Sequence, residues 1–438
     1  MEQKRLNILI VGNSIPLAKK LSSYDNVENV FMTSSKSYEG EFYIAVDYRE
    51  DDLTSLLKFV LEHGIDLTIP VCELALKNDI VEFFQSNGQA IFGPSAQACE
   101  IATSKILGKK FLHKIHAQTS KFGFFDKLQN AQKYLQEIKF PVLIRTNEVN
   151  STGDRLVCPT TSLASEFLYN LYSKGEVEVL IEEFYSGHNF TVYFITDGYS
   201  AIPFSTVANY KFCENGDAGI YTNGVGCYVL DNKVSGVVID RITNILNKTL
   251  ETLDNSGNAY MGIIGVEATL TKDDLFVVND FKFFMQDYDS DAVLSTVEEN
   301  LVEVFMACVQ GLFSDEYEII KTNDLSSVSV VVESRLAGQI VSGLDDIDEV
   351  ENLTLKPITG GYLTQQKGSA LIITRSASTL SRAVKKVYSD LEDINFKGMK
   401  YRKDIGRTLI NDDIYWFYCF TRIVGGINGE FPTIINMI

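Results

Sequence analysis

Residues 266–282 read VEATLTKDDLFVVNDFK and predict a β-hairpin, because two runs of β-branched and aromatic residues flank the polar turn KDD. In such a hairpin Glu267 and Asp280 lie on adjacent antiparallel strands. Carboxylates that face each other across a strand pair repel, so they are stable only with a cation between them. Mg²⁺ held by one or two carboxylates together with nucleotide phosphates is a common use of such a pair. The hairpin therefore favours a cation site.

Two structural interpretations stand beside the metal site. Asp280 and Lys282 are two residues apart, so on a strand their side chains share one face. Lys282 then supplies the counter-charge itself, and no metal is needed. Alternatively, Glu267 and Asp280 face opposite sides of the sheet. The spacing alone does not decide between these two interpretations and the metal site.

Composition limits the class of protein. A chain of 438 residues exceeds what one core serves, so two to four domains are expected. A net charge of −19 argues against a nucleic-acid partner, which would draw on clustered Lys and Arg. No run approaches the roughly 18 apolar residues of a membrane span, and the N-terminus does not read as a signal peptide. The scattered Cys and His fit no metal or disulfide pattern, which indicates reduced thiols in the cytoplasm.

The first ~100 residues alternate strands and helices, which predicts a parallel sheet covered on both faces. The ligand crevice of such a sheet lies at the carboxyl ends of its strands, where VGNSIP (11–16) and PVCE (70–73) stand. Gly12 lacks the GxGxxG pattern that a dinucleotide pyrophosphate needs, so a dehydrogenase is excluded.

The rest of the chain changes pattern. A Gly-Pro turn at 93–94 leads into one Lys-rich helix reaching residue 115. Further on, a hairpin is expected that consists of strand 140–146, the polar segment 147–155 and the strand LVC, and its tip can close over a ligand. Helices are expected at 161–175 and 234–253, with strands at 177–187 and 189–204 and a Gly-rich stretch at 214–229 between them. From about 320 an α+β unit without evident chemistry follows, with a helix over 379–394.

This order of features resembles the ATP-grasp ligases, and among them the glycinamide ribonucleotide synthetase (phosphoribosylamine–glycine ligase) family. The resemblance spans nearly the whole chain and rests on IFGPSAQACEIATSK (91–105), VLIEEFYSG (179–187), GDAGIYTNGVG (216–226), YMGIIG (260–265) and YRKDIG (401–406). It implies an α/β multi-domain protein: an N-terminal parallel-sheet, Rossmann-like domain over 1–103, an ATP-grasp domain of two α+β lobes over 104–320 with a mobile lobe at about 118–188, and a C-terminal α+β domain over 321–438.

The resemblance also implies a reaction. In this family ATP phosphorylates the glycine carboxylate, and the amine of phosphoribosylamine attacks the acyl phosphate, a step of de novo purine biosynthesis. The expected cofactors are ATP and one or two Mg²⁺ ions, and the expected assembly is a monomer or homodimer. Two alternatives stay open: a ligase with another amine or carboxylate substrate, and a degenerate homologue that binds a nucleotide or serves as a non-catalytic partner.

Site residues follow from the matched motifs. The resemblance assigns ATP binding to Lys105, Arg145, Glu182, Glu183, Phe184, Asn189 and Lys211. It assigns substrate binding to Gly12, Asn13, Glu73, Asp217, Gly219, Thr222, Gly224 and Gly226. It assigns metal binding to Glu267 and Asp280, and a catalytic role to Lys282 and Asp287.

The chain departs from the family pattern at several places, three of which bear on the phosphate and metal sites. NSTGDR (150–155) stands where a Gly-rich, Lys-containing loop covers the phosphates, and Asp154 there has the wrong charge for a triphosphate. Lys282 replaces a metal-ligating Asn, and an ammonium repels Mg²⁺, which makes a second metal ion doubtful. FMQDYDSD (284–291) replaces an Arg-Phe-Gly-Asp-Pro-Glu run and retains Asp287 and an acidic Asp289. Lys282 argues for the degenerate homologue, but a lysine can also replace one of two cations by contacting the phosphates itself, which leaves a single Mg²⁺ on Glu267 and Asp280. The ligase therefore stays the main expectation, and the degenerate homologue stays its alternative.

Overall fold

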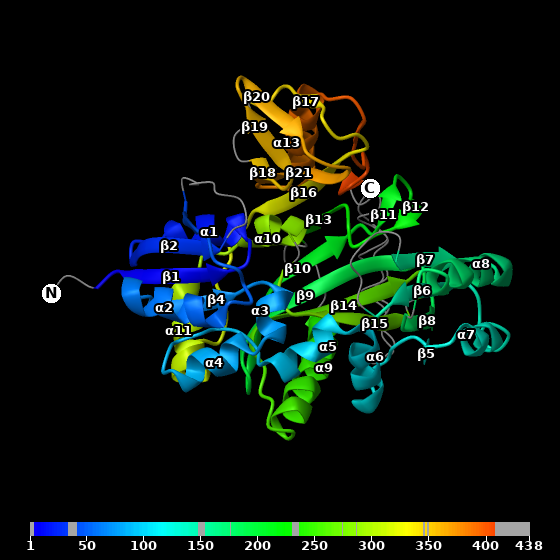
Figure 1. Ribbon diagram of the computed structural model, residues 1–438, viewed down its shortest axis with the longest axis horizontal. Coiled ribbons are helices and arrows are strands. Elements are labelled where there is room, and N and C mark those ends of the chain that lie inside the picture. Colours follow the sequence, from blue (N-terminus) through cyan, green and yellow to red (C-terminus); the bar gives the residue numbers. More distant parts are fainter. Residues whose placement is uncertain are drawn as a thin grey trace, which may run out of the picture.

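Five β-sheets organise the part of the chain that the computed structural model describes, which is residues 4–33, 42–147, 154–175, 177–229, 236–273, 275–285, 287–344, 347 and 350–407. They form an N-terminal lobe, a central sheet, a smaller lobe beyond it and a C-terminal unit (Figure 1). The predicted α/β multi-domain class is confirmed.

The N-terminal lobe is a parallel sheet in the order β3-β2-β1-β4. Its strands are β1 (Leu6–Val11), β2 (Val27–Thr33), β3 (Ile44–Val46) and β4 (Leu67–Pro70). Its helices are α1 (Ile15–Ser22), α2 (Leu53–His63), α3 (Glu73–Lys77) and α4 (Ile80–Ser86). On β1, Leu9 packs towards α2 and α4 whereas Ile8 packs towards α1. The alternation of β1 side chains between two cores confirms the prediction that both faces are covered.

The Lys-rich segment after this lobe is not one helix. It forms α5 (Ala96–Thr103) and α6 (Lys105–Lys114), so the expectation of a single helix to residue 115 is wrong. Ser104 between them is extended, with φ −102° and ψ 117°, and its hydroxyl accepts a hydrogen bond from the amide of Leu107. A serine cap at this position starts a new helix, which places Lys105 in the first turn of α6.

The central sheet runs in the order β15-β14-β9-β10-β13-β16-β21-β18, and β22 pairs with β16. Its first strands are β9 (Gly187–Asp197), β10 (Ala201–Asn209), β13 (Gly226–Val229), β14 (Met261–Thr271) and β15 (Phe276–Lys282). Its remaining strands, β16 (Ser326–Ser334), β18 (Val350–Asn352), β21 (Gly368–Ala377) and β22 (Met399–Lys400), come from the C-terminal unit. The hairpin β14–β15 pairs Glu267 opposite Asp280, as the sequence predicts. One sheet therefore crosses from the central part into the C-terminal unit.

Helices cover this sheet on both sides. α9 (Gly236–Asp254) packs Ile242 and Leu246 into the same core as Val266 of β14. On the C-terminal side α13 (Leu380–Asp393) buries Val387 against β16 and β21. α10 (Asp287–Leu294), α11 (Leu301–Gln310) and α12 (Phe313–Glu316) continue from the hairpin. Phe305 of α11 stacks on Phe92 with ring centroids 4.2 Å apart, which ties the N-terminal lobe to the central one.

The smaller lobe has its own sheet in the order β5-β8-β6-β7. It consists of β5 (Phe122–Phe125), α7 (Leu128–Tyr134), β6 (Val142–Thr146), β7 (Arg155–Cys158), α8 (Thr161–Tyr172) and β8 (Val179–Glu183). The tip of the predicted β6–β7 hairpin, residues 148–153, lies outside the described residues. The remaining strands are β11 (Phe212–Glu214), β12 (Ala218–Tyr221), β17 (Ile340–Val341), β19 (Leu355–Ile358) and β20 (Gly361–Thr364).

Gly226 shows why the Gly-rich stretch is tightly constrained. Its φ is +147°, and a Cβ there would lie 2.4 Å from the carbonyl oxygen of Ser329 on the neighbouring strand β16. A backbone atom cannot move aside as a side chain can. Gly226 therefore permits the close pairing of β13 with β16.

Gly226→Ala is expected to destabilise the protein by about 2–4 kcal/mol, because overpacking adds to an unfavourable backbone conformation. The matched control is Gly216→Ala, where φ is +70° and no atom lies within 4 Å of the added Cβ. The control should cost only about 1–2 kcal/mol of left-handed strain. Urea unfolding of both variants measures the difference, and equal losses would contradict the packing explanation.

Candidate active site

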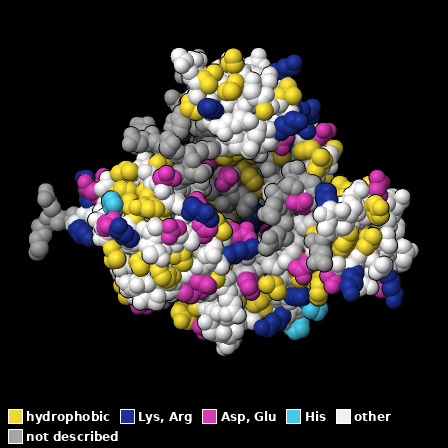
Figure 2. All heavy atoms as spheres, in the orientation of Figure 1, with side chains coloured by type: hydrophobic (Ala, Val, Ile, Leu, Met, Phe, Trp, Pro, Cys, Tyr) yellow, Lys and Arg dark blue, Asp and Glu magenta, His cyan; other side chains and the backbone are white. Residues whose placement is uncertain are grey.

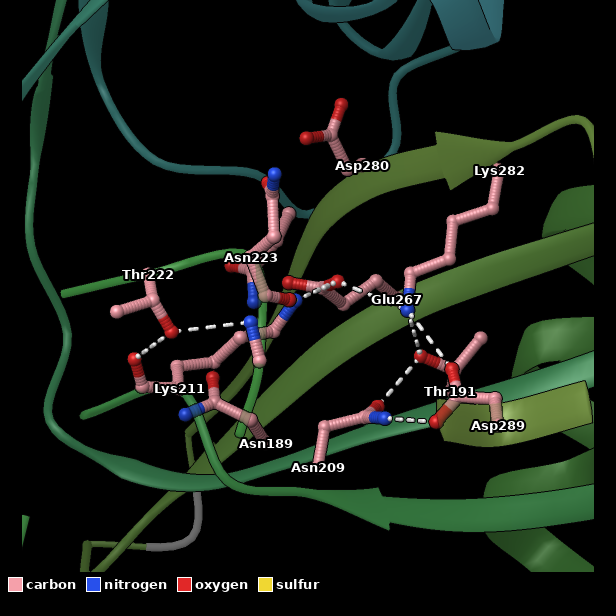
Figure 3. A network of polar contacts seen from close by, with 12 residues as sticks. Asn189, Thr191, Asn209, Lys211, Thr222, Asn223, Glu267, Asp280, Lys282 and Asp289 are labelled. Carbon is pink, nitrogen blue, oxygen red and sulfur yellow. Dashed lines mark hydrogen bonds and ion pairs between the residues drawn. The ribbon is translucent and has the colours of Figure 1, made fainter. Parts of the chain in front are cut away.

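Several of the predicted site residues meet where the hairpin β14–β15 faces α6, the smaller lobe and the segments that flank β11 and β12. Glu267 lies at the centre of this group, and Lys282 extends towards it whereas Asp280 points the other way (Figure 3). The space-filling view shows a hollow between the lobes with charged side chains of both signs around it (Figure 2). Two linked clusters of buried charges form the site.

The first cluster is built on Glu267. Lys211 Nζ donates to Glu267 Oε2 at 2.8 Å, and Lys282 Nζ lies 3.4 Å from the same oxygen. Burial alone would raise the pKa of Glu267, but the two ammonium groups outweigh it and lower that pKa to about 2. Glu267 is therefore ionised at neutral pH and shared by two lysines.

The two lysines differ in their surroundings. Burial lowers the pKa of Lys211 to about 8, and the attraction of Glu267 offsets this only in part. For Lys282, burial is outweighed by Asp289 and Glu267, so its pKa is raised. Lys282 is thus the permanent cation of the pair, and Lys211 is the one that titrates near neutral pH.

Asp289 fixes the ammonium of Lys282. Its carboxylate is fully buried and lies 3.4 Å from Lys282 Nζ, which also donates to Thr191 Oγ1 at 3.1 Å. Tyr193 and Asn209 donate to the two oxygens of Asp289 at 2.6 and 2.9 Å. Lys282 is held by acceptors on three different elements, and Figure 3 shows this network continuous from Asn209 to Glu267. An ammonium is therefore built into the position beside Glu267.

The second cluster is built on Asp280. Arg145 Nη1 donates to Asp280 Oδ2 at 2.7 Å, and Lys105 Nζ lies 3.2 Å from the same oxygen. Burial opposes ionisation, but Arg145 and Lys105 outweigh it and hold the pKa of Asp280 well below its usual range. The other oxygen, Oδ1, is buried and has no hydrogen-bond partner among the described residues. Asp280 thus presents one unsatisfied carboxylate oxygen.

Glu182 extends this cluster into the smaller lobe. Arg145 Nη2 lies 2.9 Å from Glu182 Oε1, and Lys109 Nζ lies 2.7 Å from Oε2. Ser120 also donates to Oε2 at 2.7 Å. Glu182 holds the side chains of Arg145 and Lys109 in place, and its predicted role in ATP binding stays a prediction. Lys109 was not predicted from the sequence. It follows Lys105 by four residues, so the two side chains share one face of α6, and this spacing could have identified it.

Arg155 is a site residue that sequence reasoning missed. It faces Arg145 across the β6–β7 pair, and only 7% of it is exposed. Among the described residues its guanidinium has no hydrogen bond or ion pair, and its Nε is unsatisfied. Burial and the neighbouring Arg145 both lower its pKa. Two adjacent buried guanidinium groups form an arrangement suited to phosphate oxygens.

The predicted hinge residues occupy the end of β8 and the start of β9. The amide of Phe184 donates to Pro141 O at 2.9 Å, and its ring packs edge-on against Tyr221 with centroids 5.7 Å apart. The Glu183 carboxylate accepts from the hydroxyl of Tyr185 at 2.7 Å. Asn189 Oδ1 accepts from Thr269 at 2.7 Å. The adenine-binding role of these residues stays a prediction.

The Gly-rich loop is fastened by the C-terminal motif YRKDIG. Arg402 Nη2 lies 2.7 Å from a carboxylate oxygen of Asp217, and the Asp404 carboxylate accepts from the amide of Gly216 at 2.8 Å. Thr222 donates its amide and its hydroxyl to Lys211 O. The C-terminal unit, in which the sequence showed no chemistry, therefore positions the loop that carries Lys211.

The other predicted substrate residues have local packing roles. Gly219 has φ +81° beside Cys213, and Gly224 lies against Tyr288, whose hydroxyl would be 2.1 Å from an added Cβ. Gly12 has φ +113°, and an added Cβ would contact Cys72 at 2.8 Å. These contacts explain the glycines without a ligand, and their substrate-binding role stays a prediction.

Three polar predicted residues lie at exposed or half-buried positions. Asn13 is exposed after β1, and Glu73 forms an ion pair of 2.6 Å with Lys77 on α3. Asp287 is exposed in the first turn of α10. Asp289, two residues further along the same turn, is the carboxylate that reaches Lys282. The acidic run 287–291 was predicted to contribute to the site, and within it the buried carboxylate is that of Asp289.

The predicted metal ligands Glu267 and Asp280 are both ion-paired with basic side chains in this structure, and their metal-binding role stays a prediction. Among the described residues no group of three or more His, Cys, Asp or Glu side chains could hold a metal. Mg²⁺ bound together with phosphates needs only one or two carboxylates. Ionised Glu267 and the unsatisfied oxygen of Asp280 are the candidates for this role. Two residues beyond Asp280 on β15, the ammonium of Lys282 lies 3.4 Å from Glu267 Oε2, where it repels a metal ion.

Two adjoining models of one family match residues 6–290: phosphoribosylglycinamide synthetase, N domain, over 6–102, and phosphoribosylglycinamide synthetase, ATP-grasp (A) domain, over 103–290. The chain belongs to this family of ATP-grasp ligases, as the resemblance predicted. Membership implies the use of ATP and Mg²⁺ and of small-molecule substrates.

Individual relatives agree with this assignment. The phosphoribosylamine–glycine ligase of Clostridium acetobutylicum is 26% identical over 419 residues, which are 92% of this chain and 100% of the relative. The crystal structure of phosphoribosylamine–glycine ligase from Thermotoga maritima aligns with a TM-score of 0.73 at 18% identity, covering 91% of this chain and 100% of that one. The L-amino acid ligase of Bacillus licheniformis aligns with a TM-score of 0.66 at 12% identity, covering 90% and 98%. At these identities the solved structures support the fold alone.

Removing the charge of Lys211 tests its unusual pKa. Its folded-state pKa is about 8, below the ordinary value of 10.5, so the unfolded chain binds more protons between these pH values. This group therefore makes stability rise with pH from about 8 upwards. Relative to Lys211→Met, the wild type should gain about 1 kcal/mol per pH unit between pH 8 and 10. Urea unfolding at several pH values measures this, and parallel pH profiles of the two proteins would contradict it.

Lys282→Met should destabilise the protein by about 3–5 kcal/mol, because it leaves the buried charge of Asp289 without its cation. The double variant Lys282→Met/Asp289→Asn removes both charges and should recover at least half of that loss. Chemical denaturation of the single and double variants measures the coupling. A single variant as stable as the wild type would show that the pair is not formed.

Proposed function

We propose that the protein is an ATP-dependent ligase that joins a carboxylate to an amine through an acyl phosphate, with glycine and phosphoribosylamine as substrates in de novo purine biosynthesis. The observation that carries this proposal is the pair of ionised, buried carboxylates Glu267 and Asp280 surrounded by Lys105, Arg145 and Lys211. Carboxylates for a metal and cations for phosphates in one site are the requirements of phosphoryl transfer from ATP.

The cations have a defined task in this reaction. Lys105 and Arg145 now neutralise Asp280, and a triphosphate offers them a stronger set of acceptors. Arg155, which lacks a counter-ion among the described residues, adds a second guanidinium beside Arg145. These groups fix the phosphates and stabilise the charge that develops during transfer to the substrate carboxylate.

We assign one Mg²⁺ to the nucleotide, held by Glu267 and Asp280. When bound, the ion neutralises phosphate charge and orients the transferred group. Lys282 takes the place of a second ion, because its ammonium lies on Glu267 and is fixed there by Asp289. The names of the relatives, phosphoribosylamine–glycine ligases of similar length, support glycine and phosphoribosylamine as substrates.

The second candidate is a nucleotide-binding homologue without ligase activity. The observation that favours it is the same Lys282, since an ammonium held by three acceptors cannot move as a metal–phosphate complex does. In either case we place the protein in the cytoplasm, as a monomer or homodimer. No described helix is long and apolar enough to cross a membrane.

Calorimetry and a turnover assay separate the candidates. The ligase should bind ATP with Mg²⁺ at least tenfold more tightly than without it, and should release phosphate with glycine and phosphoribosylamine generated in situ. Asp280→Asn should abolish the Mg²⁺ dependence, whereas the exposed Glu251→Gln on α9 serves as a matched control and should not. Binding without turnover on these or other amino acids and amines would establish the nucleotide-binding homologue. No ATP binding at all would overturn both.

A further inference from the structure

A second polar cavity lies away from the ATP site. It has a volume of about 450 Å³ and is formed where α1 of the N-terminal lobe, α10 and the strand β21 and helix α13 of the C-terminal unit meet. Its lining includes the basic side chains of Lys19, Lys20, Arg375 and Lys386. The active-site description used none of these residues.

The charge of this cavity is opposite to that of the protein. Four basic side chains and one carboxylate, Asp291, are found among its described lining residues, whereas the whole chain has a net charge of −19. Cations that converge in a concave site reinforce one another's potential and attract anions from solution. An overall acidic protein gains no general solubility from such a cluster, so its local charge indicates an anionic ligand.

The protein orients several of the basic groups, and the ammonium groups of Lys20 and Lys386 retain donors. Arg375 Nε lies 2.5 Å from an oxygen of Asp390, which fixes the guanidinium. Lys386 Nζ donates to Ser376 O at 3.3 Å, and Lys20 Nζ donates to Val297 O. Each ammonium has three N–H donors, so Lys20 and Lys386 each keep two beyond these backbone bonds. Burial lowers the pKa of Lys20, a cost that a bound anion would relieve.

Hydroxyl groups complete the donor set. Ser295 and Ser376 line the cavity, and their hydroxyls form a triangle with that of Ser327, with all three oxygen–oxygen distances 3.0 Å. Hydroxyls can turn to donate to an incoming acceptor. Ammonium, guanidinium and hydroxyl donors around one space are the groups that recognise phosphate oxygens.

Helix α10 separates this cavity from the ATP site. Asp289 faces Lys282, whereas Asp291 lines the cavity. Residues two apart in an α-helix are rotated by about 200° about its axis, so the two carboxylates lie on opposite faces of α10. The cavity is therefore a distinct site that shares one helix with the active site.

We propose that this cavity binds a small phosphate-bearing molecule. The volume of about 450 Å³ accommodates a ligand of the size of a sugar phosphate, and Lys20 on α1 and Lys386 on α13 can both donate to its phosphate oxygens. The proposal does not depend on the ligase activity, because none of these residues belongs to the ATP site.

Calorimetric titration with inorganic pyrophosphate at 150 mM salt tests the proposal, carried out on the full chain saturated with ATP and Mg²⁺ and again without nucleotide. Binding is expected in both conditions. Lys386→Glu should weaken it at least tenfold, whereas Lys385→Glu, at the preceding exposed position of α13, should leave it unchanged. Both positions are exposed, so circular dichroism should show both variants folded.

Three results would overturn the proposal. They are the absence of pyrophosphate binding, equal binding by the wild type and Lys386→Glu, and equal weakening by both variants, which would indicate a general charge effect. If the wild type binds no ATP, the proposed ligase function is overturned but the cavity proposal is not. Pyrophosphate binding that depends on Lys386 would still locate a ligand in the cavity.

Discussion

The carboxylate of Glu267, held between two buried ammonium groups, is the interaction on which the rest of the site depends. The register of β14 and β15 places it opposite Asp280 and beside Lys282. Buried charges persist only when they are paired and hydrogen-bonded. Lys282 accordingly requires Asp289, and Asp289 in turn requires the donors of Tyr193 and Asn209. One carboxylate thus determines the polar interior of the central sheet and the position of α10.

Local periodicity predicted the parts of the structure that depend on neighbours in sequence. The strand pattern and short turn were enough to place Glu267 opposite Asp280, and the alternation of strands and helices predicted the N-terminal sheet. The break at Ser104 was missed because a single serine reads equally well inside a helix until its backbone is seen. Whether a serine caps a new helix depends on tertiary contacts as well as on the local sequence.

Long-range partners could not be predicted from the sequence. Asp287 and Asp289 are equivalent in an acidic run, and only the rotation of α10 decides which one reaches Lys282. Arg155 carries no motif, and its role follows from facing Arg145 across a strand pair beside a loop without family residues. The glycines of 216–226 were expected to contact a ligand. Close packing against β16 or Tyr288 also accounts for Gly226 and Gly224, because an added Cβ would clash there. Fold-level resemblance locates a site more reliably than it assigns each side chain.

The pairing of β13 with β16 has a consequence for the independence of the C-terminal unit. A strand that gives up its partner exposes a row of unpaired amide and carbonyl groups, which invites edge-to-edge association with other chains. Here the partner of β13 comes from residues 326–334, and YRKDIG fastens the preceding loop to the same unit. The C-terminal unit is therefore not a detachable module, because a chain ending before it would expose the edge of β13 to aggregation.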